Sequence, residues 1–146
     1  MKTIISTHIG TYGIIIENNK IALIKKARGG YKGKLDLPGG GIEHTELPHE
    51  TLKRELIEEI GVELKECKLF DVTSTNFTWL MDKDLYEDLH HIGILYLVDL
   101  DDKELKIDGD GIDSEGADWY VINNLKKDEL SPFVKYSLEK LGYKLK

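Results

Sequence analysis

The sequence contains a single cysteine, Cys67, among 146 residues. One thiol excludes an intramolecular disulfide, and disulfide-free chains are typical of the reducing cytoplasm, where we expect this protein to work. Cys67 stands in an apolar stretch, so we expect a small buried side chain there and not a nucleophile. Long hydrophobic runs are also missing. None approaches the roughly 18 residues that a membrane-spanning helix needs, so no membrane partner is predicted.

Positive charge is the scarcer sign: 20 Lys and Arg residues face 27 Asp and Glu residues, a net charge of −7. This balance argues against a partner that is a nucleic-acid polymer, because such binding depends on neutralising many phosphates. It also means that a polyanionic substrate needs local help from a metal ion or a basic patch. Hydrophobic residues make up 40% and charged residues 32%, as in ordinary globular proteins, and we expect one domain over residues 1–146.

The stretch from Gly40 to Val62, GGIEHTELPHETLKRELIEEIGV, carries the strongest chemical signal. On a helix, Glu55, Glu58 and Glu59 fall within an arc of roughly 100°. Like charges packed this closely destabilise a bare helix, and a hard cation bound by their oxygens removes that cost. Acidic stripes are more often solvated faces, so the three glutamates alone do not decide the matter. An apolar stripe beside them would fix the helix to a core: Leu52, Leu56 and Ile60.

The spacing of the whole stretch decides in favour of a metal site. The fixed positions are Gly40, then after five residues Glu46, after seven Arg54-Glu55-Leu56, after one Glu58-Glu59, and after one Gly61-Val62. This pattern arises by chance roughly once in 10⁸ chains of this length. It matches every fixed position of the Nudix box, and the chain resembles the Nudix hydrolases. These enzymes cleave nucleoside diphosphates linked to another group.

The resemblance implies an α/β (α+β) fold, a Nudix-type α/β/α sandwich with a mixed β-sheet. It implies a metal-dependent nucleotide pyrophosphohydrolase whose Mg²⁺ or Mn²⁺ is held by the Gly40 carbonyl and by Glu55, Glu58 and Glu59. Glu55 and Glu115 are rival candidates for the general base. An additional acid is expected before a tryptophan-bearing strand, and Asp113 or Glu115 can supply it.

The remaining box residues have supporting roles. Arg54 lies one turn before Glu58, which allows an ion pair, and we interpret it as an orienter of the catalytic glutamates. The resemblance assigns Glu46 to hydrogen bonds that support the preceding loop. Gly61 is expected to end the helix. Thr45 is a candidate cap at its start, and Pro48 suits its first position.

Five cations and no acid lie between Lys25 and Lys34, the basic segment. Charge-assisted donors of this kind capture phosphate, and the resemblance places this loop beside the substrate cleft. We therefore predict that Arg28, Lys32 and Lys34 bind the substrate. The alternative is a solvated loop that offsets the acidic helix at long range.

Hydrophobic patterning predicts the other elements. Adjacent histidines, His90 and His91, would face opposite sides of a strand, which argues against a shared metal. A loop is expected over 83–88, a helical turn over 123–129 and a final helix over 131–141. Strands are expected over 3–17, 20–26, 35–37, 63–72, 73–82, 92–100 and 118–121.

Two other functions compete with hydrolysis. A Nudix-fold module that binds nucleotides without cleaving them is one, and a prenyl-diphosphate isomerase is the other, although the latter needs cysteine chemistry. The partner is expected to be a small nucleotide-type diphosphate whose identity the sequence leaves open. Tyr31, Phe77 and Trp79 are candidates either for base stacking or for the core. Exposed strand edges also suggest a homodimer.

Overall fold

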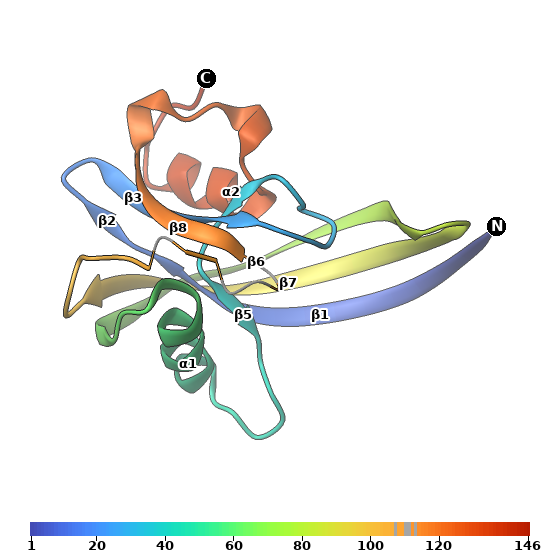
Figure 1. Ribbon diagram of the computed structural model, residues 1–146, viewed down its shortest axis with the longest axis horizontal. Helices are drawn as coiled ribbons and strands as arrows, with labels where there is room; N and C mark the ends of the chain where they lie inside the picture. The colour runs from blue at the N-terminus through green and yellow to red at the C-terminus, as the bar shows by residue number, and fades with distance from the viewer. Residues whose placement is uncertain (107, 110–111, 113) are drawn as a thin grey trace.

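The computed structural model describes residues 1–146 apart from 107, 110, 111 and 113. Figure 1 shows the path of the chain, with the two helices on opposite sides of the strands. In chain order the elements are β1 (Lys2–Ile14), β2 (Ile16–Glu17), β3 (Lys20–Lys26), β4 (Leu35–Asp36), β5 (Gly39–Gly41), α1 (Pro48–Ile60), β6 (Leu64–Asp82), β7 (Leu85–Leu100), β8 (Ser114–Val121), the 3₁₀ turns Ile122–Asn124 and Lys127–Glu129, and α2 (Pro132–Lys140).

The strands form two sheets. One has the order β5-β1-β7-β6, in which β1 and β7 run parallel and the other pairs antiparallel, so this sheet is mixed as expected. In the other, β3 lies between β2 and β4 and also pairs with β8. Asn18 and Asn19 join β2 to β3 with positive φ angles of 49° and 63°, as a tight hairpin turn requires.

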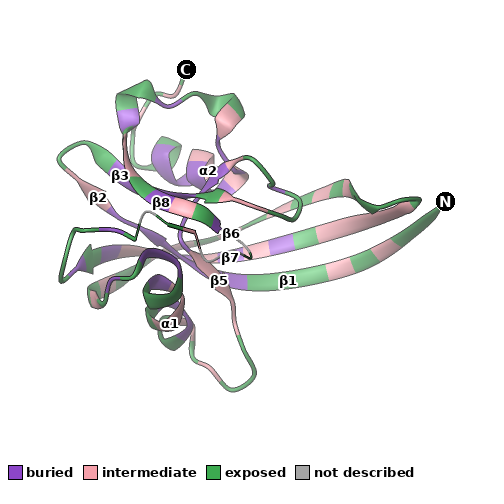
Figure 2. Cartoon of the chain, in the orientation of Figure 1, coloured by how far each residue is buried: buried purple, intermediate pink, exposed green. Residues whose placement is uncertain are grey.

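Both faces of β3 are covered, which explains its continuous apolar run. Ile21 and Leu23 belong to the core on the side of α2, whereas Ala22 and Ile24 belong to the core on the side of α1. Figure 2 shows buried residues gathered where the strands pass between the helices. The α/β/α layering is therefore confirmed.

Helix α1 begins one residue after Leu47, with Pro48 in the first turn as predicted. The Leu47 N–H donates to Glu50 Oε1 at 2.8 Å, so a glutamate side chain satisfies the helix start. The expected cap at Thr45 is wrong, because Thr45 lies in the preceding turn with φ 72°. Gly61 ends the helix in the left-handed region. The predicted apolar stripe is fully buried: Leu52, Leu56 and Ile60.

The largest errors concern β6 and β7. Residues 63–72 and 73–82 form one strand, and 83–88 is not a loop, because β7 begins at Leu85 after a tight turn in which Asp84 has φ 59°. Polar residues along both strands hide the pairing from a hydrophobic pattern. Strand β8 likewise begins at Ser114, earlier than expected. The predicted 3₁₀ region and final helix are confirmed within a few residues.

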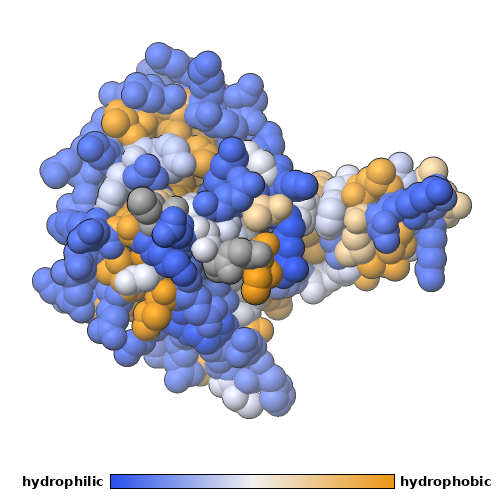
Figure 3. Space-filling model, in the orientation of Figure 1, coloured by the Kyte–Doolittle hydropathy of each residue, from blue (hydrophilic) through white to orange (hydrophobic). Residues whose placement is uncertain are grey.

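Strands β1, β6 and β7 project from the body as an arm, with the N-terminus at its tip (Figure 1). Apolar residues are visible on this arm in Figure 3, and Ile5 of β1 is 85% exposed. Within the described part of the chain, no helix has the length and apolar character required to cross a membrane.

Candidate active site

A cleft of about 1020 Å³ opens between the base of the arm, the basic segment, β5 and α1. It brings together residues that are far apart in the sequence and that carry both signs of charge. The lining includes the carboxylates Asp36, Glu55, Glu59 and Glu87, the cations Lys26, Arg28 and Lys32, the aromatic residues Tyr12, Tyr31, Phe77 and Trp79, and the histidines His8 and His91.

The glycine strand β5 lies directly against two of the box glutamates. A Cβ atom placed on Gly40 would approach Glu55 Oε1 to 2.6 Å, so a side chain there would displace the Glu55 carboxylate. One residue earlier, the Gly39 N–H donates to Glu59 Oε1 at 2.7 Å. The glycines therefore let the backbone of β5 pack against both carboxylates at the floor of the cleft.

Glu59 is a buried acid of the cleft with a raised pKa. Glu59 is only 4% exposed, and this burial raises the pKa of its carboxyl group to about 8. The hydrogen bond from Gly39 and the charge of Lys26 oppose this increase, and the charges of Glu55 and Asp36 add to it. A buried carboxyl of this kind favours a proton or a bound cation in its neighbourhood.

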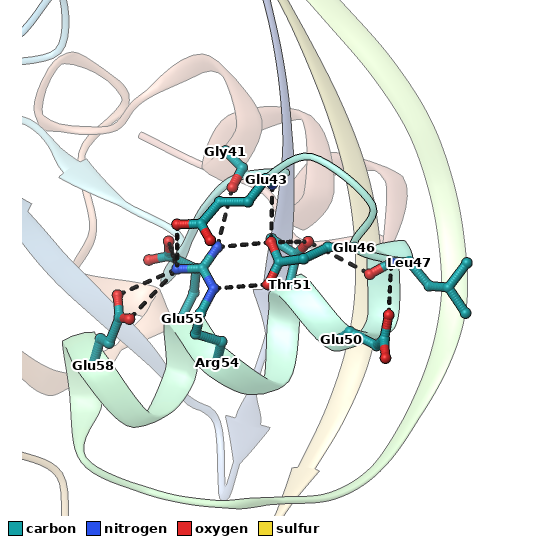
Figure 4. Close-up of polar contacts among 9 residues, drawn as sticks. All are labelled: Gly41, Glu43, Glu46, Leu47, Glu50, Thr51, Arg54, Glu55 and Glu58. Atoms are coloured by element: carbon teal, nitrogen blue, oxygen red, sulfur yellow. Dashed lines mark hydrogen bonds and ion pairs between the residues drawn. The ribbon is translucent and has the colours of Figure 1, made fainter.

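Arg54 holds the loop and the glutamates together, as Figure 4 shows. Its Nε donates to Glu46 Oε2 at 2.8 Å, its Nη1 donates to Glu55 Oε1 at 2.8 Å, and Nη1 lies 3.4 Å from Glu58 Oε2. Its Nη2 also donates to the Gly41 carbonyl at 3.3 Å. The hydrogen bonds that Glu46 accepts, from Arg54 first and then from the Glu43 N–H and the Thr51 hydroxyl, lower the pKa of Glu46 to about 2. Arg54 therefore contacts Glu46, Glu55 and Glu58, while the orienting role of Arg54 and the supporting role of Glu46 stay predictions.

The three box glutamates differ in environment although they share one arc of α1. Glu55 and Glu59 line the cleft, whereas the Glu58 side chain is 54% exposed and turns towards Arg54. Over the described residues, no three Asp, Glu, His or Cys side chains converge closely enough to enclose a metal ion. The donors that the box itself supplies, the Glu55 and Glu59 carboxylates beside the glycine strand, are nevertheless oxygens, and buried Glu59 favours positive charge, so these residues fit a hard divalent cation.

The structure separates the predicted substrate-binding cations. Arg28 and Lys32 line the cleft, but Lys34 donates to the main-chain carbonyl of Asp128. Lys26 also lines the cleft, and its charge affects Glu59. Lys26 is a cleft residue that the pattern-based prediction omits, although its place in the basic segment is a signal for it.

The candidates for an additional acid lie on β8 and just before it. Glu115 is half-exposed, and its Oε2 lies 3.9 Å from Lys25 Nζ. It is not among the residues that line the cleft. Asp113 lies outside the described residues. Cys67 is half-buried against the core on the side of α1, burial raises the pKa of its thiol, and it too is absent from the cleft lining.

A hydrogen-bonded group that the sequence did not reveal closes the cleft floor. Tyr12 Oη lies 2.6 Å from His91 Nε2, and Tyr31 Oη lies 2.8 Å from His91 Nδ1. Burial, with smaller effects from the charges of His8 and Lys26, lowers the pKa of His91 to about 3. His91 is buried while His90 is exposed, as the alternation of a strand requires. This group links β1, the basic segment and β7.

Aromatic residues form one wall of the cleft. The rings of Tyr31 and Phe77 lie 5.2 Å apart, and Trp79 Nε1 donates to Glu87 Oε1 at 2.7 Å. Gly30 packs against Phe77 so closely that a Cβ atom would approach its ring to 2.5 Å. All three side chains line the cleft, with Tyr31 buried and Phe77 and Trp79 half-buried.

Residues 7–141 match the family model of the NUDIX domain. The chain belongs to the Nudix family. This confirms the resemblance carried by the box, and the match extends over nearly the whole described fold.

Curated relatives and solved structures agree with this assignment. The chain is 37% identical over 115 residues to an ADP-ribose pyrophosphatase of Methanocaldococcus jannaschii, covering 79% of this chain and 62% of that protein. It is 32% identical over 71 residues to an 8-oxo-dGTP diphosphatase of Proteus vulgaris, covering 48% of this chain and 63% of the relative. It thus spans about three-fifths of the length of these relatives.

The fold matches that of a MutT NUDIX hydrolase from Burkholderia pseudomallei with a TM-score of 0.75. The match covers 93% of this chain and 98% of the other, at 23% sequence identity. At this identity the comparison establishes the fold.

Proposed function

We propose that this chain is a metal-dependent hydrolase that cleaves a diphosphate linkage in a nucleoside di- or triphosphate derivative. The observation that carries the proposal is the juxtaposition of Glu55 and buried Glu59, packed on the glycine strand, with Arg28 and Lys32 across one cleft. Carboxylates for a cation and cations for phosphate are the two requirements of phosphoryl-transfer chemistry.

Glu55, Glu59 and the Gly40 carbonyl would hold Mg²⁺ or Mn²⁺, with Glu58 as a further ligand. When bound, the ion neutralises diphosphate charge and lowers the pKa of water. Arg54 keeps Glu55 in place through its bond at 2.8 Å, and Arg28 and Lys32 bind the phosphates. Glu55 or Glu115 accepts the proton of the attacking water, and the first already lines the cleft.

The relatives named above are an ADP-ribose pyrophosphatase and an 8-oxo-dGTP diphosphatase. Both names describe cleavage within a nucleotide's phosphate chain, which supports the same reaction class for this chain. The aromatic wall of Tyr31, Phe77 and Trp79 supports a substrate that carries a base. We further propose that the enzyme works in the cytoplasm and forms a homodimer.

The test is a panel of ADP-ribose, oxidised and normal nucleoside triphosphates, dinucleoside polyphosphates and nucleotide sugars, each assayed with Mg²⁺, with Mn²⁺ and with excess EDTA. We expect phosphate-containing products that depend on the cation. Full turnover in EDTA would refute the metal role. Nucleotide binding without any product would favour the silent binding module. The isomerase alternative lacks support, because Cys67 lies outside the cleft lining.

A further inference from the structure

The outer edge of β1 is open along the arm. On one side β1 pairs with β7 from Lys2 to Ile14. On the other side β5 pairs only with residues 10–12, and the last contact towards the arm is the Ile42 N–H donating to the Ile9 carbonyl at 3.1 Å. Among the described residues, none pairs with the outer edge of residues 3–8. Figure 1 shows β1 as the outermost strand of the arm.

The backbone groups at this edge can be assigned from the residues that β5 does contact. The Ile9 carbonyl accepts from Ile42, and the Gly13 N–H donates to Pro38 O, so odd-numbered residues of β1 direct their polar groups to this side. Because a strand alternates with a period of two, Thr3, Ile5 and Thr7 direct their N–H and C=O groups to the open edge. A row of unused donors and acceptors of this kind is a template for another strand.

The side chains give this edge none of the usual protection against pairing. Between Thr3 and Ile9 there is no proline, glycine, lysine or acidic residue. The segment is rich in β-branched residues, which favour strand pairing. At its centre the apolar side chain of Ile5 is 85% exposed.

We propose that two copies of this chain pair antiparallel through β1, about a two-fold axis at Ile5. Ile5 then faces Ile5 of the second copy, and Thr3 faces Thr7. Every outward N–H and C=O of these three residues gains a partner, and the two arms become one continuous sheet. The contact is isologous, as in most homodimers. It specifies the homodimer proposed above and does not depend on the metal chemistry.

The register follows from the end of β5. A slip of one residue would oppose outward groups to inward ones and remove the hydrogen bonds. A slip of two residues in one direction places Thr3 opposite Ile9, whose carbonyl Ile42 already uses. The opposite slip places Thr3 opposite Ile5 and leaves Thr7 opposite Met1, outside strand β1, which begins at Lys2.

The first test is sedimentation velocity of the full chain and two variants across a wide concentration range. We expect the wild type at twice 16.6 kDa and Ile5→Lys at 16.6 kDa, because two ammonium groups would meet at the axis. Val72→Lys is the matched control, since Val72 is also an exposed apolar residue but lies on β6, away from the β1 edge. It should remain dimeric. Equal far-UV circular dichroism spectra for both variants would show that folding is intact, because the melting temperature itself depends on dimerisation.

The second test addresses the register in a Cys67→Ala background. Paired Cα atoms in such a sheet lie about 5.5 Å apart, which a disulfide can span. Ile5→Cys should give a covalent dimer on oxidation, whereas Thr3→Cys alone should not, because its opposite residue is Thr7. A wild type that stays monomeric, or an Ile5→Lys variant that stays dimeric, would overturn the proposal. Equal cross-linking of both cysteine variants would overturn the register.

Discussion

Replacing Glu59 by glutamine separates a metal-binding carboxylate from a structural one. In the folded protein the pKa of Glu59 is raised from its ordinary value of 4.5 to about 8. The folded state therefore holds a proton that the unfolded state releases, and the stabilisation is complete below pH 4.5 and lost as pH rises through 8. At pH 7, which is about 2.5 pH units above the ordinary pKa, ionisation of Glu59 in the unfolded state costs the folded protein about 3 kcal/mol of stability.

Glutamine keeps an acceptor for the Gly39 N–H but cannot ionise. We therefore expect Glu59→Gln to exceed the wild type in free energy of unfolding by up to about 3 kcal/mol in EDTA at pH 7. The difference should fall towards zero as pH drops to 4.5. Denaturant unfolding across this pH range, with chelator, measures it. The same change should lower kcat by at least about 10²-fold, because the charge that holds the cation is gone.

Two variants serve as comparisons. Glu58→Gln should also lower kcat by at least about 10²-fold, but it is less clean because Glu58 lies 3.4 Å from Arg54. Glu63→Gln removes an exposed carboxylate just beyond α1 and should change neither quantity. If Glu59→Gln melts early and still hydrolyses substrate normally, the metal-site interpretation of α1 is wrong.

Two further predictions concern the cleft. Charge reversal by Arg28→Glu or Lys32→Glu should raise KM with little change in melting temperature. Lys34→Glu is the control, because Lys34 lies outside the cleft lining, and it should leave KM unchanged. If all three variants have the same KM, the basic segment is a solvated loop and does not bind the substrate. The pKa of His91 is lowered from 6.5 to about 3, so its contribution to stability is present above 6.5 and lost as pH falls towards 3. Between pH 6.5 and 3 the free energy of unfolding should therefore fall less for His91→Gln than for the wild type, by up to about 4 kcal/mol. Unfolding free energies that fall in parallel for the two proteins would contradict this.

What the sequence could predict is what a single helix encodes locally. The box spacing placed Leu52, Leu56 and Ile60 on a buried stripe and Gly61 at the helix end, since these relations need only the 3.6-residue period. The different burial of Glu58 and Glu59 was not predictable in this way. It depends on where β5 lies, and the helix period says nothing about that.

Contacts between distant residues were the other limit. His91 bonds partners 79 and 60 residues away, and no local pattern brings β1, the basic segment and β7 together. The first part of β7 was missed for a similar reason. Strand is predicted over 63–82 and 92–100, but residues 85–91 gain their order from pairing with β1 and β6, and their polar side chains hide the hydrophobic pattern of a strand.

The hydrogen bonds that join Tyr12, His91 and Tyr31 all run in one direction along the group. With its pKa near 3, His91 is neutral at ordinary pH, and a neutral imidazole offers one N–H and one lone pair. One tyrosine therefore donates its hydroxyl hydrogen to the ring, and the other accepts from it and keeps its own hydrogen for another acceptor. Both tyrosines line the cleft. The two tautomers of His91 thus present the free hydroxyl donor at opposite ends of the group, on Tyr12 or on Tyr31.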